Sequence, residues 1–196
     1  MFQLIRPAVV TMALFTLILG LGYPLAITAM AGLAFPDQAG GSLAWDAAGH
    51  VIGSRLLAQG FAKPEYLHPR PSAAGNGYDP MNSAGSNLGP LDEKLIDRVK
   101  TDAIAIAKDA GGAPIPADAV TTSASGLDPD VSPQNARMQA ARIAAHRGVA
   151  TQEIQTVIDT NRQDPLLGFI GQPRVNVLAV NRALDARYPV AQPKGP

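Results

Sequence analysis

The chain has 196 residues, with 16 basic and 16 acidic side chains and no cysteine. The lack of cysteine excludes disulfides, thiolate catalysis and zinc–thiolate sites. The balanced charge provides no basic field for nucleic acid, so we expect no nucleic-acid partner.

One apolar run, from Ala8 to Phe35, contains no charged residue. Because an α-helix rises about 1.5 Å per residue, roughly 20 apolar residues cross the hydrocarbon core of a bilayer. The apolar part of a secretory signal is only about 7–15 residues long. The length therefore favours a transmembrane helix over residues 8–35, in contact with membrane lipid, rather than a cleaved signal.

The flanking charges predict how this helix is oriented. Arg6 precedes it, whereas Asp37 and Asp46 follow it before the next cation, Arg55. The positive-inside rule then places residues 1–7 in the cytoplasm and residues 36–196 outside it. In a Gram-negative cell this describes a single-pass protein of the inner (plasma) membrane with a periplasmic domain.

Small residues within the helix predict a contact with another helix. Ala13, Thr16 and Gly20 fall near one helical face, where small side chains let a second helix approach closely. Pro24, next to Gly22, predicts a kink or a loosened turn in the outer half.

The next part of the chain is poor in regular structure. Between Gly40 and Phe61, short apolar pieces separated by glycines predict a small hairpin and then one helical turn. Residues 66–90 are dense in Gly, Asn, Ser and Pro. A loop of this length is unusual in a compact domain unless it binds something or is held by its own packing. We predict a contact loop with Arg70 as its strongest polar anchor.

The remaining residues predict helices with clear end signals and one strand. We expect a helix with an apolar stripe of Leu91, Leu95 and Val99 ending at Gly111, and a strand within residues 115–123. Asp128-Pro129 predicts a turn. Further helices are expected from Ser132 to Gly148, from Thr151, and from Asn176, with a Gly- and Pro-rich loop over residues 161–174. The expected fold is one transmembrane helix followed by a single soluble α+β domain with long Gly/Pro-rich loops.

Motifs of catalysis are missing from the chain. It has no phosphate-binding loop, no nucleophile elbow and no HExxH, and its three histidines are far apart in sequence. These features favour a non-catalytic protein without a metal site. A membrane-anchored periplasmic hydrolase acting alone stays open as the alternative, because folding could bring a base to Ser86.

Several short motifs follow the N-terminal helix in a fixed order. They are Gly53-Ser54 with Gln59 and Phe61, Arg70-Pro71-Ser72-Ala73, Gly85-Ser86-Asn87-Leu88-Gly89-Pro90, the run from Val120 to Pro133, Gln139-Ala140-Ala141-Arg142, and Val175-Asn176-Val177-Leu178. With these motifs the chain resembles the C subunit of the Kdp-type potassium-transporting ATPase over essentially its whole length.

This resemblance implies a heteromeric potassium pump. Its partners would be a potassium-translocating A subunit, an ATP-hydrolysing P-type B subunit and a small F subunit. The C subunit would be a non-catalytic accessory chain, needed for assembly and described as a catalytic chaperone that raises the ATP affinity of the B subunit. ATP and potassium would be handled by the partners, and we assign no cofactor to this chain. A domain outside the cytoplasm would influence ATP binding only through the conformational equilibrium of its partner.

Ten residues are candidates for contacts with these partners. They are Ala13, Thr16 and Gly20 in the apolar helix, and Arg70, Ser72, Ser86, Asn87, Asp128, Gln139 and Arg142 in the domain.

Overall fold

The computed structural model describes residues 2–46 and 48–190. The chain divides into two compact units, Met1–Ser54 and Arg55–Pro196. The boundary between the units follows the hairpin, so the hairpin belongs with the apolar helix.

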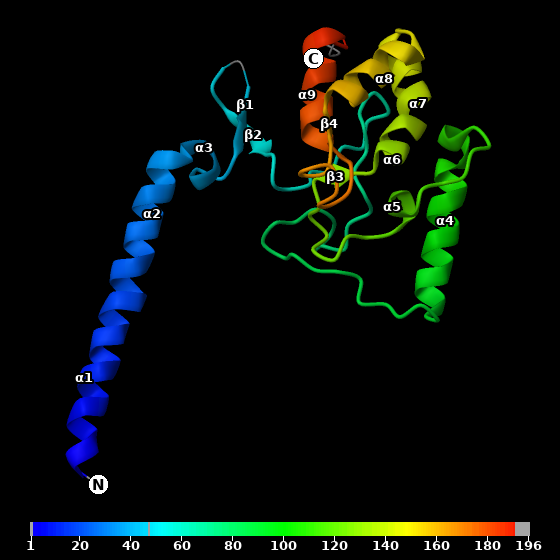
Figure 1. Cartoon of the computed structure of the whole chain (residues 1–196). Helices are drawn as coiled ribbons and strands as arrows, with labels where there is room; N and C mark the ends of the chain where they lie inside the picture. Colours follow the sequence, from blue (N-terminus) through cyan, green and yellow to red (C-terminus); the bar gives the residue numbers. More distant parts are fainter. Residues whose placement is uncertain (1, 47, 191–196) are drawn as a thin grey trace, which may run out of the picture. The chain divides into compact units, whose positions relative to one another are not determined.

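The first unit begins with one long helix (Figure 1). After a short 3₁₀ turn, η1 (Phe2–Leu4), it comprises α1 (Ile5–Phe15), the π-helical η2 (Thr16–Gly22) and α2 (Tyr23–Ala34). Together they span 30 residues, Ile5–Ala34, and are long and apolar enough to cross a membrane. The predicted N-terminal apolar helix is confirmed.

The helix loosens just before Pro24, as predicted. The N–H of Tyr23 donates to the carbonyl of Ile18, five residues back, which is the π-helical pattern. Proline has no N–H, and its ring crowds the carbonyl four residues earlier, here that of Gly20. The widened turn accommodates the proline without ending the helix.

A short helix and a hairpin complete this unit. Helix α3 (Pro36–Ala39) precedes strands β1 (Leu43–Trp45) and β2 (Val51–Ser54), which pair antiparallel with Leu43 opposite Ser54. The hairpin prediction is confirmed. The helical turn expected after it is wrong, because the N–H of Ala58 is used in a bond to the distant carbonyl of Leu127, 2.9 Å away.

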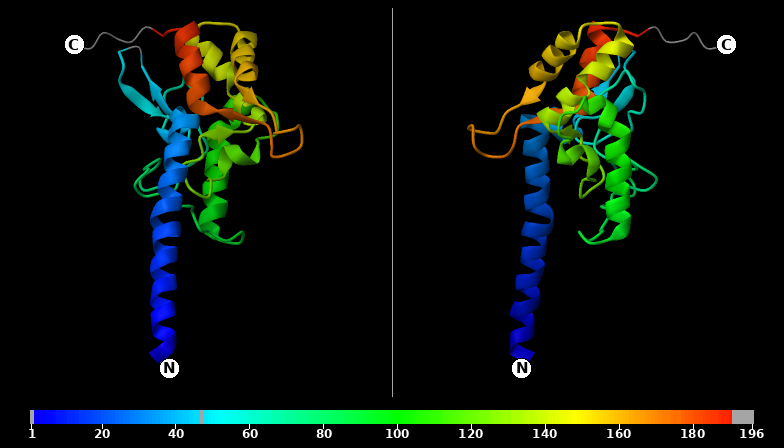
Figure 2. Two further views of the ribbon diagram at one scale, coloured as in Figure 1. Left: turned by 60° about the vertical axis from the view of Figure 1, so that its left-hand side comes forward. Right: turned by 90° about the vertical axis from the view of Figure 1, so that its right-hand side faces the viewer.

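The second unit combines a small antiparallel sheet with helices. The strand order is β3 (Asp130–Val131), β5 (Arg174–Asn176), β4 (Arg162–Gln163). Helices α6 (Pro133–Met138), α7 (Ala140–Arg147), α8 (Thr151–Thr160) and α9 (Val177–Arg187) lie beside it. The connection between β4 and β5 extends beyond the helices (Figure 2). The predicted α+β class is confirmed.

The helix ends predicted from local sequence at Ser132, Asn176 and Gly148 are confirmed. The Ser132 hydroxyl accepts a hydrogen bond from the N–H of Asn135 at 3.1 Å, and the Asn176 side chain accepts from the N–H of Ala179 at 3.0 Å. Gly148 ends α7 with a φ of +68°. The helix expected from Ser132 to Gly148 is divided into α6 and α7 at Gln139, and α7 and α8 form the predicted helical hairpin.

Two expectations for residues 91–123 differ from the structure. Helix α4 (Glu93–Ala110) forms and is capped by Asp92, but none of its residues is buried. The predicted strand is wrong, because α5 (Ala117–Val120) occupies its centre. Pro116 begins this helical turn, and the Thr121 hydroxyl closes it by donating to the carbonyl of Ala117 at 2.8 Å.

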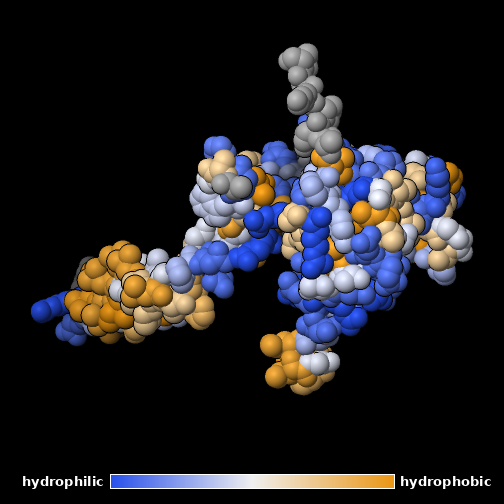
Figure 3. Space-filling model, turned by 90° about the horizontal axis from the view of Figure 1, so that it is seen from above, coloured by the Kyte–Doolittle hydropathy of each residue, from blue (hydrophilic) through white to orange (hydrophobic). Residues whose placement is uncertain are grey.

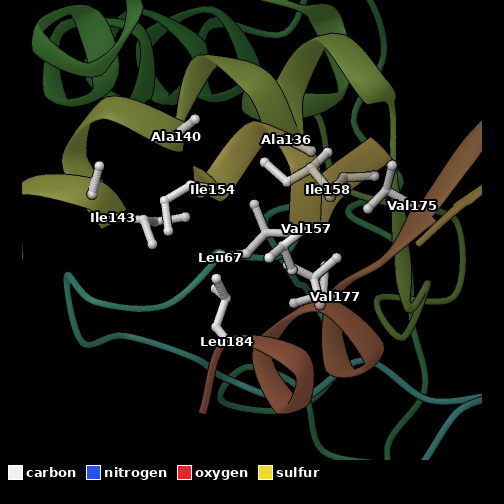
Figure 4. Close-up of a cluster of buried hydrophobic side chains, with 13 residues drawn as sticks. Leu67, Ala136, Ala140, Ile143, Ile154, Val157, Ile158, Val175, Val177 and Leu184 are labelled. Atoms are coloured by element: carbon white, nitrogen blue, oxygen red, sulfur yellow. The ribbon is translucent and has the colours of Figure 1, made fainter. Parts of the chain in front are cut away.

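The hydrophobic core lies between α6–α9 and the central strand β5, as Figure 4 shows. Leu67, from the long loop, is fully buried in this core. Its fully buried neighbours come from the helices and β5, and include Ala136, Ala140, Ile143, Ile154, Ile158, Val175, Val180 and Leu184.

Two amide side chains hold the backbone beside Leu67. Asn181 accepts from the N–H of Leu67 at 2.8 Å and donates to its carbonyl at 2.9 Å. The Gln139 side chain likewise accepts from the N–H of His68 at 2.8 Å and donates to its carbonyl at 3.1 Å. Both amides are buried, with exposures of 1% and 5%. They provide the backbone pairing that a neighbouring strand would give in a sheet.

Replacing Asn181 by Ala should therefore destabilise the protein strongly. The change leaves the buried N–H and carbonyl of Leu67 without partners, at a cost of about 1–3 kcal/mol each. We expect the free energy of unfolding to fall by about 2–6 kcal/mol in urea titrations of the detergent-solubilised chain. Gln152→Ala, on the exposed face of α8, should change it by less than about 0.5 kcal/mol. Equal effects of the two variants would contradict the role assigned to Asn181.

Candidate functional site

Arg70 and Asp128, two of the predicted contact residues, pair with each other. Arg70 Nη1 lies 3.1 Å from Asp128 Oδ2. The same guanidinium also donates to the carbonyls of Thr121 and Thr122 and to the Thr121 hydroxyl, at 3.3–3.4 Å. Arg70 thus joins the long loop to residues 121–128, and its predicted role at a partner stays a prediction.

Ser72 makes the second connection between the same two segments. Its hydroxyl donates to the carbonyl of Gly126 at 2.6 Å and accepts from the N–H groups of Ala74 and Tyr78 at 3.1 and 2.9 Å. Gly126 has a φ of +68°, and a Cβ there would lie 2.6 Å from the nitrogen of Ala74. Only glycine fits at this point, where the two segments of the chain cross.

The segment that contains Ser86 and Asn87 packs against the same residues. The N–H of Ala84 donates to the carbonyl of Ser125 at 3.0 Å, and a Cβ on Gly85 would lie 2.8 Å from the carbonyl oxygen of Ala124. Ser86 is half-buried and Asn87 is exposed. Three motifs that are distant in sequence, 70–73, 85–90 and 120–133, therefore form one packed group of loops, which we call the loop platform.

A cleft of about 760 Å³ opens beside the loop platform. Its charged lining consists of two arginines and three aspartates, one more negative than positive charge: Arg70, Arg174, Asp118, Asp128 and Asp130. Arg174 Nε lies 3.0 Å from Asp130 Oδ2. Burial raises the pKa of the Asp130 carboxyl above its ordinary value of 3.8, against the hydrogen bond from Asn176 and the charge of Arg174.

Asp118 is held at the other side of the cleft by the start of α6. Its carboxylate accepts from the N–H and hydroxyl of Ser132 at 2.7 and 2.9 Å, and from the Asn135 amide at 3.1 Å. Sequence reasoning missed Asp118, Asp130 and Arg174 as members of one site. Of these three, only Asp130 lies next to a predicted feature, the Asp128-Pro129 turn, and the other two come from distant segments.

Gln139 and Arg142 lie inside the domain rather than on its surface. The Gln139 amide binds the backbone of His68, accepts from Arg142 Nη2 at 2.7 Å and donates to Asn135 Oδ1 at 2.9 Å. Arg142 Nε lies 2.6 Å from Asp109 Oδ2, which ties α7 to α4. Arg142 also donates to the carbonyls of Pro64 and Tyr66. Both residues order the long loop in this structure.

Two of the three small residues predicted to contact another helix lie in one hollow of the apolar helix, and the contact itself stays a prediction. A shallow hollow along the helix is lined by Thr16 and Gly20 together with larger residues such as Phe15 and Leu19. Ala13 is outside this lining.

The histidines contact groups other than serine in the described part of the chain. His50 Nδ1 lies 3.2 Å from Asp46, His68 Nε2 lies 3.0 Å from the Lys63 carbonyl, and His146 Nδ1 lies 2.9 Å from the Arg142 carbonyl. Residues 2–46 and 48–190 contain no group of three or more His, Cys, Asp or Glu side chains that could hold a metal ion. The cleft offers charge pairing and hydrogen bonding.

These features define a class of protein: one candidate membrane-spanning helix joined to an α+β unit with a loop platform and a mixed-charge cleft. The profile of the family KdpC, described as "K+-transporting ATPase, c chain", matches residues 5–186. The chain therefore belongs to the KdpC family, and the resemblance predicted from the motifs is confirmed.

Curated relatives match the chain over nearly its whole length. Potassium-transporting ATPase KdpC subunits from Caulobacter sp. (strain K31) and Beijerinckia indica are 63% and 54% identical over 195 and 198 residues, covering 100% of both chains in each case. The subunit of the same name from Myxococcus xanthus is 51% identical over 187 residues, which cover 94% of this chain and 86% of the relative.

A pair of glycine variants tests the loop platform. Gly126 and Gly148 share a φ of +68°, but only Gly126 has backbone atoms where a Cβ would be. Gly148→Ala should cost about 1 kcal/mol for the left-handed backbone alone. Gly126→Ala should cost at least about 2 kcal/mol, since the backbone of a neighbouring segment of the same chain must also move.

Urea unfolding and limited proteolysis within residues 70–90 would measure the two effects. Faster cleavage is expected only in Gly126→Ala. Equal stability losses and unchanged cleavage in both variants would contradict the close packing of the platform.

Proposed function

We propose that this chain is the accessory C subunit of an ATP-driven, high-affinity potassium uptake complex, needed for its assembly and stability. The observation that carries the proposal is similarity to KdpC subunits over the full chain, including 63% identity to one relative. The partners are the potassium-translocating A subunit, the ATP-hydrolysing B subunit and the small F subunit. Phosphoryl chemistry is assigned to the B subunit, and this chain is non-catalytic.

We further propose that residues 8–35 span the inner membrane, with residues 1–7 in the cytoplasm and residues 36–196 in the periplasm. Arg6 before the helix, and Asp37 and Asp46 after it, support this orientation. The helix packs beside helices of the larger subunits, and Thr16 and Gly20 lie in a hollow where another helix can approach. Ala13 is retained as a candidate contact on a neighbouring face.

The exterior domain, in this proposal, sits over the potassium entrance and contributes to assembly and the local field. Of the predicted polar contacts, Asn87 is exposed and Ser86, Arg70 and Asp128 are partly accessible. Ser72, Gln139 and Arg142 act indirectly, by ordering the loops. A rise in the ATP affinity of the B subunit, the catalytic-chaperone role, then passes through the conformational equilibrium of the partners, because the domain and the ATP lie on opposite sides of the membrane.

Truncation after Ser54, at the boundary between the two units, tests the need for the exterior domain. The remaining anchor and hairpin should still reach the membrane. We expect the purified complex to be less stable and its apparent potassium affinity to fall by about 10-fold, within the usual range of coupling between sites. Potassium-stimulated ATPase activity measures both effects against the full-length complex. Unchanged assembly and potassium affinity would overturn the assigned role.

Single cysteines test the orientation, since the natural chain has no thiol. Asn87→Cys places a thiol on an exposed position of the domain, and Gln3→Cys places one before the apolar helix. A membrane-impermeant maleimide should label Asn87→Cys in intact spheroplasts and Gln3→Cys only after lysis. The opposite pattern would reverse the proposed topology.

A further inference from the structure

A cluster of large apolar side chains is exposed in the connection between β4 and β5. The segment Pro165–Gly171, which we call the apolar tip, contains Leu166, Leu167, Phe169 and Ile170, with exposures of 68%, 75%, 76% and 51%. No charged residue occurs from Pro165 to Pro173. In Figure 3 the tip is the separate hydrophobic cluster at the lower edge of the view. Such a cluster in water marks an interaction site.

The tip has a defined conformation. Leu166 and Ile170 exchange backbone hydrogen bonds of 3.1 and 2.9 Å, and the N–H of Gly168 donates to the carbonyl of Pro165 at 3.0 Å. Leu167 has a φ of +55°, which is unfavourable for a leucine. The turn therefore presents its apolar side chains in an arrangement formed before any partner binds, which lowers the ordering cost of binding.

The base of the tip is fixed to the core. Strand β5 is the central strand, and its Val175 is fully buried. Arg162 and Val175 face each other where β4 pairs with β5. Both ends of the connection that carries the tip therefore begin at paired strands of the sheet.

The charges around the tip decide between lipid and protein as its partner. Arg162 lies 2.7 Å from Asp164, and Arg174 lies 3.0 Å from Asp130, so both arginines at the base are paired with aspartates. Gln172 and Pro173 connect the tip to the cleft, whose charge is net negative. Anionic headgroups attract unpaired cations and would be repelled by such a surface. An apolar centre with a polar rim of both charges is the pattern of a protein interface.

We propose that the apolar tip inserts into an apolar pocket of a larger subunit of the same transport complex, with the neighbouring cleft as the polar rim of the contact. The proposal rests on the proposed function, because it assumes that this chain assembles with such subunits. Leu167 and Phe169 are the central anchors, since they are the most exposed of the four side chains.

Photo-crosslinking identifies what the tip touches. Phe169→Cys in the full-length chain, co-expressed with the other subunits and labelled with a benzophenone maleimide, should form an adduct with another subunit in native membranes. Leu91→Cys, also a highly exposed apolar position (89%), is the matched control and should form none. An adduct with lipid alone, no adduct, or equal protein adducts at both positions would overturn the proposal.

A second pair of variants measures the contribution of the tip to assembly. The double variant Leu167→Ser/Phe169→Ser should leave thermal unfolding of the isolated chain unchanged, and should speed its dissociation from the detergent-purified complex by about 30-fold or more. Leu91→Ser/Ile104→Ser removes two equally exposed apolar side chains elsewhere and should dissociate at the natural rate. Equal dissociation rates for both double variants would overturn the proposal.

The two experiments separate the tip from the proposed function. If the natural full-length chain does not co-purify with ATPase subunits, the proposed function fails. If the natural chain co-purifies but Phe169→Cys forms no protein adduct, only the role of the tip fails.

Discussion

The fold depends on two buried amides that replace a missing strand. Leu67 and His68 cross the domain interior between helices, where their backbone groups have no sheet to join. Asn181 from α9 and Gln139 from the junction of α6 and α7 each give one of these residues both a donor and an acceptor. An unpaired buried backbone group is costly, so this pairing is what permits a loop to carry Leu67 into the core. The entry of the long loop, and hence the position of Arg70 and Ser72, follows from it.

Internal bonding also connects the motif residues to one another. The side chains of Arg70 and Ser72 form hydrogen bonds with residues 121–128. Gly85 and Gly126 allow segments of the chain to approach each other closely. The arginine and serine side chains shape a surface instead of projecting from it. The mixed-charge cleft, Asn87 and the apolar tip remain accessible to a partner, which fits the proposed accessory role.

Features encoded locally were predictable from the sequence, and features formed by distant residues were not. Ser132, Asn176 and Gly148 mark helix ends through bonds and backbone angles within a few residues. The β-branched residues near Val120 suggested a strand, but no neighbouring strand pairs with them, and Pro116 and Thr121 favour a helical turn. Gln139 and Arg142 were predicted as partner contacts, and their bonds to backbone groups about 70 residues earlier in the chain could not be foreseen from spacing. The cleft collects side chains from four segments, and no spacing rule connects them.

The π-helical turns of the apolar helix have a consequence for how it meets its neighbours. Each residue of a regular α-helix turns by about 100°, and a wider turn resets this count for everything beyond it. The halves on either side of η2 therefore do not share one continuous stripe. In a bilayer, such a helix would have two contact registers and could pack against different neighbours at the two depths.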